Sequence, residues 1–218
     1  MRIDIMTLFP DAIEAMMGQS IIGRARDRGY IRLYTHQIRE YTTNKQMQVD
    51  DYPYGGGRGA VMQADPLYRC WDHICQEAGE RVHTIYLSPC GRVFDQQVAK
   101  ELKASYERMI LVCGHYEGVD QRFIDECVDE EISMGDFVLT GGEIPAMALA
   151  DCLCRMVPGV LPEERAAPPT SPTGTVCWST RSTPGRRSGT DGRFRRCCCR
   201  ATMGRWMTGG KRSAISAP

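Results

Sequence analysis

The sequence predicts an α/β fold with a mostly parallel sheet. Strand-like and helix-like patterns alternate through about residue 158, and this βαβα alternation is typical of parallel sheets covered by helices. No segment repeats with a period of roughly 20 to 50 residues, which excludes solenoids and propellers. The 218 residues suffice for one or two domains with a real hydrophobic core.

Five runs rich in apolar and β-branched residues predict the strands. They lie at about 2–8, 30–38, 82–88 and 108–113, with a shorter one at 137–140. Between them, helical spacing of apolar residues predicts helices at about 11–26, 65–78, 95–106, 120–128 and 143–157. The last helix has Pro145 near its first turn and stops at Pro158-Gly159, residues that favour a helix start and a helix end.

The distribution of charge divides the chain near Glu164. The whole chain has a formal net charge of zero, from 27 basic and 27 acidic residues. Residues 1–164 hold 16 of the basic and 26 of the acidic residues, whereas residues 165–218 hold 11 basic residues and one acidic residue. We therefore expect a folded domain at 1–164 and a segment of different character at 165–218.

Residues 165–218 lack the composition of a folded domain. They contain no Leu, and their only Ile, Val and Phe residues are Val176, Phe194 and Ile215. Pro, Gly, Ser and Thr make up 26 of these 54 residues. A segment so poor in apolar side chains does not offset the entropy lost on ordering, so we expect it to be disordered.

The sequence predicts a cytoplasmic protein. No apolar run approaches the roughly 18 residues of a membrane span, and the first residues lack the features of a signal peptide. Seven cysteines are scattered through the predicted helices and strands without paired Cys-x-x-Cys spacing. We expect them to be small buried apolar residues rather than disulfide partners or zinc ligands.

Three glycine-rich turns, at 54–59, 114–118 and 139–143, lie beside apolar runs or open a predicted helix. In open α/β sheets ligands bind outside the carboxyl ends of the strands, and glycine lets the backbone approach a ligand closely. A single glycine pair is most often an ordinary tight turn. Three such turns, together with the strand end at 86–89, predict a ligand site.

Several other kinds of site do not fit the sequence. There is no G-x-x-x-x-G-K-[ST] motif, and Gly55 and Gly57 do not follow a clear strand, which disfavours a P-loop or a Rossmann cradle. His115 has no Ser or Cys in the context of a triad partner, which disfavours nucleophilic hydrolysis. We interpret the acidic run at 129–131 as a solvated helix end in preference to an Mg²⁺ site.

Four blocks in order resemble bacterial tRNA (guanine-N1)-methyltransferase. They are YGGGRG at 54–59 after Asp50-Asp51, YLSPCGR at 86–92, ILVCGHYEGVDQR at 110–122 and DEEISMGDFVLTGGEIPAM at 129–147. The resemblance covers residues 1–164 almost continuously. It implies a methyltransferase of the SPOUT class, an obligate homodimer with a deep C-terminal trefoil knot, which is a rare exception to the rule against knots.

The resemblance further implies a reaction, cofactors and a site. The reaction is methyl transfer from S-adenosylmethionine to N1 of the guanine just 3′ of the tRNA anticodon, with Mg²⁺ as a further cofactor. Matched residue by residue, the implied cofactor-binding residues are Tyr86, Leu87, Ser88, Pro89, Gly114, Tyr116, Glu117, Gly118, Met134, Gly135, Phe137, Leu139, Gly141, Gly142 and Pro145. Such a cofactor suits a thin apolar slot for adenine and glycine backbone beside the methionine tail.

Arg155 is the candidate catalytic residue, because it matches the family's arginine beside the target guanine. A cation near O6 of the base would stabilise the negative charge that develops as N1 loses its proton. The alternative is an ion pair with Asp151 on an exposed helix face, four residues earlier.

The family's continuation, which carries a catalytic aspartate and a helical tRNA-binding domain, is not readable after Glu164. Codons can be chosen for residues 175–190 and 193–204 so that the frame one nucleotide earlier reads GLLEYPQYTRPEVWH and AVPPVLLSGDHG. The first resembles that continuation and the second restores the missing leucines. We therefore expect 165–218 to be an out-of-frame translation and this chain to be inactive. The alternatives are a cofactor- or RNA-binding remnant without turnover and a nucleotide-binding α/β domain with another role.

Overall fold

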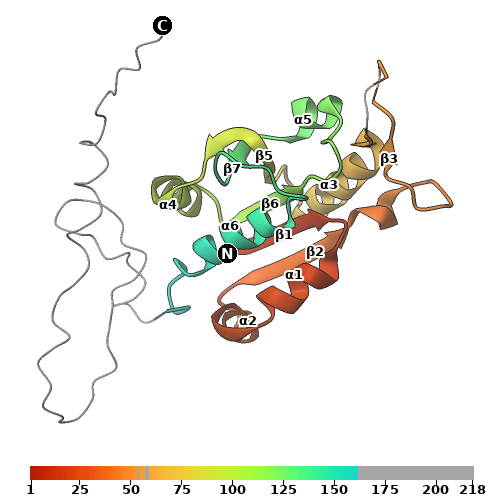
Figure 1. The fold of residues 1–218 in the computed structure, drawn as a ribbon. Helices are drawn as coiled ribbons and strands as arrows, with labels where there is room; N and C mark the ends of the chain where they lie inside the picture. The colour runs from red at the N-terminus through yellow and green to blue at the C-terminus, as the bar shows by residue number, and fades with distance from the viewer. Residues whose placement is uncertain (54, 57–58, 162–218) are drawn as a thin grey trace, which may run out of the picture. The chain divides into compact units, whose positions relative to one another are not determined.

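The structure, a computed structural model, describes residues 1–53, 55–56 and 59–161 (Figure 1). The predictions of a boundary at residue 164 and of disorder at 165–218 lie outside the described residues. Strands and helices alternate from residue 2 to residue 154, as the sequence pattern predicts.

A five-stranded parallel sheet forms the centre of the fold. Its strand order is β2-β1-β6-β5-β7, and every neighbouring pair is parallel. The strands are β1 (Arg2–Thr7), β2 (Arg32–Gln37), β5 (His83–Val93), β6 (Arg108–Cys113) and β7 (Glu130–Ser133). A separate antiparallel pair consists of β3 (Asp50–Asp51) and β4 (Val61–Met62). The predicted α/β class with a mostly parallel sheet is confirmed.

Helices cover both faces of this sheet (Figure 1). Those of the described residues are α1 (Pro10–Met17), α2 (Ser20–Asp27), the 3-10 helix η1 (Ile38–Tyr41), α3 (Ala64–Ala78), α4 (Gln96–Ser105), α5 (Gln121–Cys127) and α6 (Glu143–Cys154). One face packs against α1, α2, α4 and α6, and the other against α3 and α5. No helix within the described ranges combines the length and apolar character needed to cross a membrane.

The central strands bury side chains on both faces. In β1, Ile3 and Ile5 pack into the core beneath α1 and α6, whereas Met6 packs into the core beneath α3. In β6, Leu111 and Val112 divide in the same way between the two cores. Burial on both sides explains why these strands are continuously apolar in the sequence.

The single helix predicted at 11–26 is two helices. The amide of Gly18 donates to the carbonyl oxygen of Glu14 at 2.9 Å and ends α1, and Ser20 begins α2 with a φ of +55°. The two helices approach each other closely, because a Cβ on Gly23 would lie 2.1 Å from the Gly18 carbonyl oxygen. Periodicity alone does not reveal this break, since apolar spacing continues across it.

The strand predicted at 137–140 is wrong. The fifth strand of the sheet is β7, which pairs with β5, while the side chains of Phe137 and Val138 are 55% and 80% exposed. The interpretation of 129–131 as a solvated helix end is also wrong, because α5 ends at Cys127 and the acidic residues lead into β7. The strand β7 was missed because it begins with charged residues, and the loop at 137–140 was mistaken for a strand because it is mostly apolar.

The cysteines behave largely as predicted. All seven within the described residues are free thiols, and Cys70, Cys75, Cys113, Cys127 and Cys154 are buried. Cys152 is half-buried, and Cys90 is exposed. Burial raises the pKa of the Cys127 and Cys154 thiols to about 12, so they remain uncharged packing residues at neutral pH.

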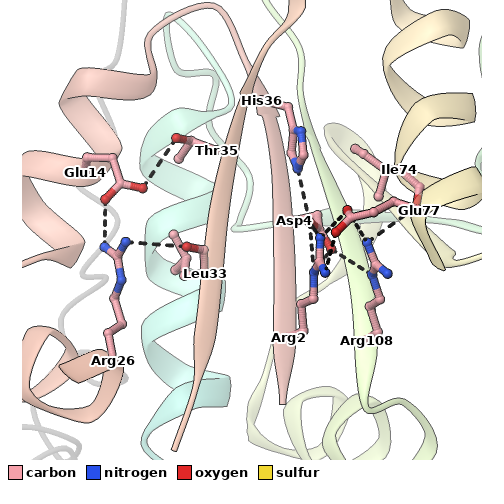
Figure 2. Close-up of polar contacts among 10 residues, drawn as sticks. All are labelled: Arg2, Asp4, Glu14, Arg26, Leu33, Thr35, His36, Ile74, Glu77 and Arg108. Atoms are coloured by element: carbon pink, nitrogen blue, oxygen red, sulfur yellow. Dashed lines mark hydrogen bonds and ion pairs between the residues drawn. The ribbon is translucent and has the colours of Figure 1, made fainter. Parts of the chain in front are cut away.

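A buried polar cluster joins β1 to its neighbours on the α3 side of the sheet (Figure 2). Asp4 is fully buried, and its carboxylate lies 2.9 Å from Arg2, 2.9 Å from Arg108 of β6 and 3.1 Å from His36 of β2. Glu77 of α3 pairs with the same two arginines. Burial acts to raise the pKa of Asp4, but hydrogen bonds from His36 and Arg2 outweigh it and hold that pKa below its ordinary value.

Candidate active site

A cavity of about 200 Å³ opens at the carboxyl ends of three neighbouring strands, β5, β6 and β7. Three segments line it: the first loop (86–89), the second loop (114–118) and the third loop (134–142). This is the edge at which open parallel sheets bind ligands. The structure therefore brings together strand ends that the sequence singled out separately.

The first loop arises from an irregularity within β5. Leu87 and Arg92 both pair with Ile132 of β7, so the residues between them bulge out of the ladder. A Cβ on Gly91 would lie 2.4 Å from the Glu131 backbone, which keeps the bulge tight. Ser88 stays buried in the bulge, and its Oγ accepts a hydrogen bond from the Cys90 amide at 3.2 Å.

The second loop begins where β6 ends. A Cβ on Gly114 would lie 2.8 Å from the ring of Tyr86, so glycine is needed for the ring to cover the backbone there. Tyr116 has a φ of +59°, a strained value for a residue with a side chain. Burial, aided by the charge of Glu131, raises the pKa of Tyr86, so its hydroxyl stays protonated in the cavity wall.

The glycine-rich turn at 54–59 leads into a segment that packs on the second loop. The Glu117 amide donates to the Ala60 carbonyl oxygen at 3.0 Å, and the Met62 amide donates to the Gly118 carbonyl oxygen at 2.9 Å. A Cβ on Gly59 would lie 2.3 Å from the Glu117 side chain. The first glycine motif thus supports the second loop.

The third loop starts with a tight turn after β7. The Ser133 Oγ donates to the Gly135 carbonyl oxygen at 3.0 Å and accepts from the Gly135 amide at 3.2 Å. Gly135 has a φ of +149°, and a Cβ on it would lie 2.7 Å from the Phe137 ring. This turn precedes Phe137, Val138 and Leu139, which are among the residues that line the cavity.

Gly142 brings the third loop into contact with the second. Its amide donates to the Gly114 carbonyl oxygen at 2.9 Å, and a Cβ on it would lie 2.7 Å from the Cys113 Cα. The obstructing atom belongs to the backbone, so a side chain at this position would displace the loop. Gly142 also immediately precedes α6, which has Pro145 in its first turn.

Fourteen of the fifteen residues that the resemblance implies for cofactor binding line this one cavity. They are Tyr86, Leu87, Ser88, Pro89, Gly114, Tyr116, Glu117, Gly118, Met134, Phe137, Leu139, Gly141, Gly142 and Pro145. The exception, Gly135, shapes the turn behind Phe137. Five more lining residues are His115, Ile132, Ser133, Val138 and Thr140. They lie within the same sequence blocks, but the resemblance did not imply them as cofactor-binding residues.

Arg155 does not line the cavity. It follows the C-terminal end of α6, while Gly142 and Pro145 at the other end of that helix line the cavity. Twelve helical residues span about 18 Å. Arg155 is exposed. The alternative ion pair with Asp151 is not formed among the described residues, where the Arg155 amide donates to the Asp151 carbonyl oxygen.

The acidic run at 129–131 serves the pairing of β5 with β7. Asp129 accepts hydrogen bonds from the Thr84 amide at 2.8 Å and from Arg81 at 3.0 Å, and Glu130 lies 3.1 Å from His83. The described parts of the chain contain no group of three or more His, Cys, Asp and Glu residues placed to hold a metal ion. We therefore assign no step to Mg²⁺.

Comparison with known proteins gives consistent matches. The family described as tRNA (Guanine-1)-methyltransferase TrmD matches residues 1–174. A tRNA (guanine-N(1)-)-methyltransferase of Ruminiclostridium cellulolyticum is 49% identical over 164 residues, covering 75% of this chain and 70% of that protein. The protein of the same name from Alkaliphilus oremlandii is 48% identical over 169 residues, covering 75% and 68%.

A solved structure matches as well. The crystal structure of tRNA (m1G37) methyltransferase from Aquifex aeolicus aligns with a TM-score of 0.69 and 38% identity, covering 75% of this chain and 72% of that one. The three loops that line the cavity all fall within the range of the family match. The chain therefore belongs to the tRNA (guanine-1)-methyltransferase TrmD family.

Proposed function

We propose that residues 1–164 bind S-adenosylmethionine in the cavity between the three loops. An enzyme of this family with an intact continuation after Glu164 would then transfer the methyl group to N1 of the guanine 3′ of the tRNA anticodon, in the cytoplasm. The convergence of three loops, distant in sequence, on one cavity carries this proposal. Family membership supports the reaction class, since the relatives are named tRNA (guanine-N(1)-)-methyltransferases.

The chemistry of the cavity fits this cofactor. Leu87, Ile132 and Leu139 offer apolar walls for a planar heterocycle, and exposed backbone in the loops offers hydrogen-bonding groups. A Cβ on Gly114 or Gly141 would meet a side chain within 2.8 Å, so the glycines leave room that other residues would fill. These features favour a ligand that has a planar ring and a bent tail and that does not require an oppositely charged group in the cavity wall.

The chain's own residues would hold and orient the reactants. When bound, the cofactor supplies an electrophilic methyl group on sulfur. Arg155 would place its guanidinium beside O6 of guanine and stabilise the charge that appears as N1 loses its proton to a general base. In the family that base is an aspartate, which is not readable in this frame.

An obligate homodimer with a trefoil knot is part of the proposal. Arg155 and the cavity of the same copy lie at opposite ends of α6, so one guanine does not reach both within a single copy. A second copy could supply its Arg155. Exposed apolar side chains beside the cavity support such a contact; they are Phe9, Phe137, Val138 and Ile144.

We further propose that residues 165–218 are an out-of-frame translation, which leaves this chain without general base and tRNA-binding domain. Such a chain would be a cofactor-binding remnant without turnover. The shift in charge at Glu164 and the loss of leucine support this proposal. Resequencing the gene across the codon for Glu164 tests it directly, and a reading without an insertion or deletion relative to close relatives would contradict it.

Two assays on the 218-residue chain test the function. Calorimetric titration with S-adenosylmethionine should show saturable binding, and its absence would refute the cofactor site. Incubation with unmodified tRNA and labelled cofactor should give no N1-methylguanine. Detectable methylation would overturn the inactivity of this chain while supporting the reaction.

A further inference from the structure

His115, which lines the cavity, has a ring nitrogen to which the proposed function assigns no role. The Nδ1 atom of His115 is buried and has no hydrogen-bond partner among the described residues. Buried polar side-chain atoms are nearly always paired in folded proteins, so this one requires an explanation.

The carboxylate of Glu143 lies close to this nitrogen. Its Oε2 lies 3.9 Å from His115 Nδ1, beyond hydrogen-bonding distance. Its Oε1 accepts a hydrogen bond from the Thr7 hydroxyl at 2.9 Å, and Thr7 is fully buried at the end of β1. The Thr7 hydroxyl in turn accepts from the Phe9 amide at 2.9 Å. One oxygen of the carboxylate is thus fixed, and the other faces the imidazole.

Two aromatic rings hold the imidazole in place. The rings of Phe9 and Tyr116 each pack edge-on to His115, with centroids 5.3 Å away. The left-handed backbone of Tyr116 persists only if its surroundings hold it there. The gap between His115 and Glu143 is therefore bounded by fixed groups rather than by loose side chains.

The third loop crosses directly over this gap. A Cβ on Gly141 would lie 2.5 Å from Glu143 Oε2 and 2.6 Å from His115 Nδ1. The next residue, Gly142, bonds to Gly114 of the second loop at 2.9 Å. Any change in the separation of His115 and Glu143 consequently moves the third loop against the second.

We propose that His115 and Glu143 form a latch that closes when the cofactor fills the cavity. In the closed latch, Nδ1–H of His115 donates to Oε2 of Glu143, which requires the two atoms to approach by about 1 Å. Closure fixes the third loop on the cofactor. The proposal rests on the proposed cofactor site, and both residues are positioning residues, with no assigned contact to reacting atoms.

The test is calorimetric titration of the full chain with S-adenosylmethionine. His115→Phe keeps the aromatic contacts and removes the donor, so we expect affinity to fall about tenfold. His115→Asn returns an N–H donor near the Nδ1 position and should bind within about threefold of the unaltered chain. His73→Phe, at another ring contact on α3 and away from the cavity, is the matched control and should not change affinity.

A double-variant comparison and NMR spectroscopy distinguish a latch from a role of His115 in stabilising the fold. If the two residues act through one hydrogen bond, His115→Phe should cause no further loss of affinity in a Glu143→Ala background. In ¹⁵N NMR, the Nδ1 resonance of His115 should shift much further on addition of cofactor in the unaltered chain than in Glu143→Ala, although His115 lines the cavity in both. Neither the coupling nor this difference between the two chains would be observed if His115 only packed against its neighbours.

The outcomes are distinguishable. The latch would be overturned if His115→Phe bound the cofactor as tightly as the unaltered chain, or if His115→Asn bound it as weakly as His115→Phe. Either result would leave the cofactor site intact. Absence of binding by the unaltered chain would overturn the proposed function and the latch with it. Should His115→Phe fail to fold, the NMR titration of the unaltered chain decides, because a resonance that stays in place overturns the latch.

Discussion

Asp4 shows how a charged residue is kept inside the sheet. Its buried carboxylate is surrounded by Arg2, Arg108 and His36, so its charge is compensated on several sides. Removing one member of a buried ion pair leaves the partners uncompensated and costs about 3 to 5 kcal/mol. We expect Asp4→Asn to lower the free energy of unfolding by about that amount in urea denaturation at neutral pH.

An exposed ion pair provides the control for that variant. Asp65 and Arg69 lie four residues apart on the surface of α3, at 2.9 Å. Solvent screens such pairs, so Asp65→Asn should leave stability almost unchanged. If both variants lost the same free energy of unfolding, burial of Asp4 would not add to the strength of its ion pairs.

The pH dependence of stability gives a second prediction for Asp4. Its pKa in the folded state is lowered, whereas an unfolded aspartate titrates at about 3.9. Between these values the unfolded state binds more protons, so stability is full above about pH 5 and is lost as the pH falls through the folded pKa. Urea midpoints measured from about pH 5 to about pH 2 should fall less steeply for Asp4→Asn than for the unaltered chain.

Among the elements, the contact between the second and third loops limits what Gly142 can become. A Cβ there would lie 2.7 Å from the Cys113 Cα and 2.9 Å from the Gly114 nitrogen. We expect Gly142→Ala to weaken S-adenosylmethionine binding at least about tenfold in calorimetry, because the third loop must shift away.

Gly79 supplies the matched control for Gly142. It has a φ of +76° at the end of α3, and a Cβ there would point into open space among the described residues. Gly79→Ala should cost about 1 to 2 kcal/mol of stability through backbone strain while leaving cofactor affinity unchanged. A similar loss of affinity in both variants would contradict a local effect of Gly142.

The elements also show where sequence patterns suffice. The central strands and most helices were predictable, because strands buried on both faces are continuously apolar and helices space their apolar residues with the helical period. β7 was not, because it begins with the charged residues Glu130 and Glu131, and Glu130 meets its partner His83 only in the folded sheet. The apolar run at 137–140 lines a cavity, and its exposure depends on the turn at Gly135.

The site was predictable in membership but not in geometry. The family resemblance of the four sequence blocks implied 14 of the 19 residues that line the cavity. The bulge in β5 and the packing of Ala60 on Glu117 depend on distant parts of the chain. His115 stood inside a glycine motif and had no visible partner in sequence. Its neighbours Thr7 and Glu143 are 136 residues apart, so only the fold reveals the group.

At the scale of the whole molecule, the placement of Arg155 separates binding from turnover. In an enzyme whose continuation after Glu164 is restored to the family frame, Arg155→Ala should slow methyl transfer by about 10²- to 10³-fold. Cofactor affinity should change little, because Arg155 lies outside the cavity that we assign to the cofactor. Single-turnover kinetics measures the rate of methyl transfer, and calorimetry measures cofactor affinity. Equal losses of rate and affinity in Arg155→Ala would favour a structural role for this residue.

The proposed dimer makes a sharper prediction in the restored enzyme. If each active site combines the cavity of one copy with Arg155 of the other, Arg155→Ala and Gly142→Ala chains damage different halves of that site. With the cofactor held below its dissociation constant for the unaltered chain, each variant alone should retain about a tenth of the unaltered rate or less. Random mixing makes half of the dimers mixed, and each mixed dimer contains one intact site, so methyl transfer should return to about a quarter of the unaltered rate. Chains refolded together from urea and assayed on unmodified tRNA provide the measurement. If activity does not exceed that of the separate variants, Arg155 acts within its own copy or the dimer does not form, and sedimentation of the mixture decides between these two cases.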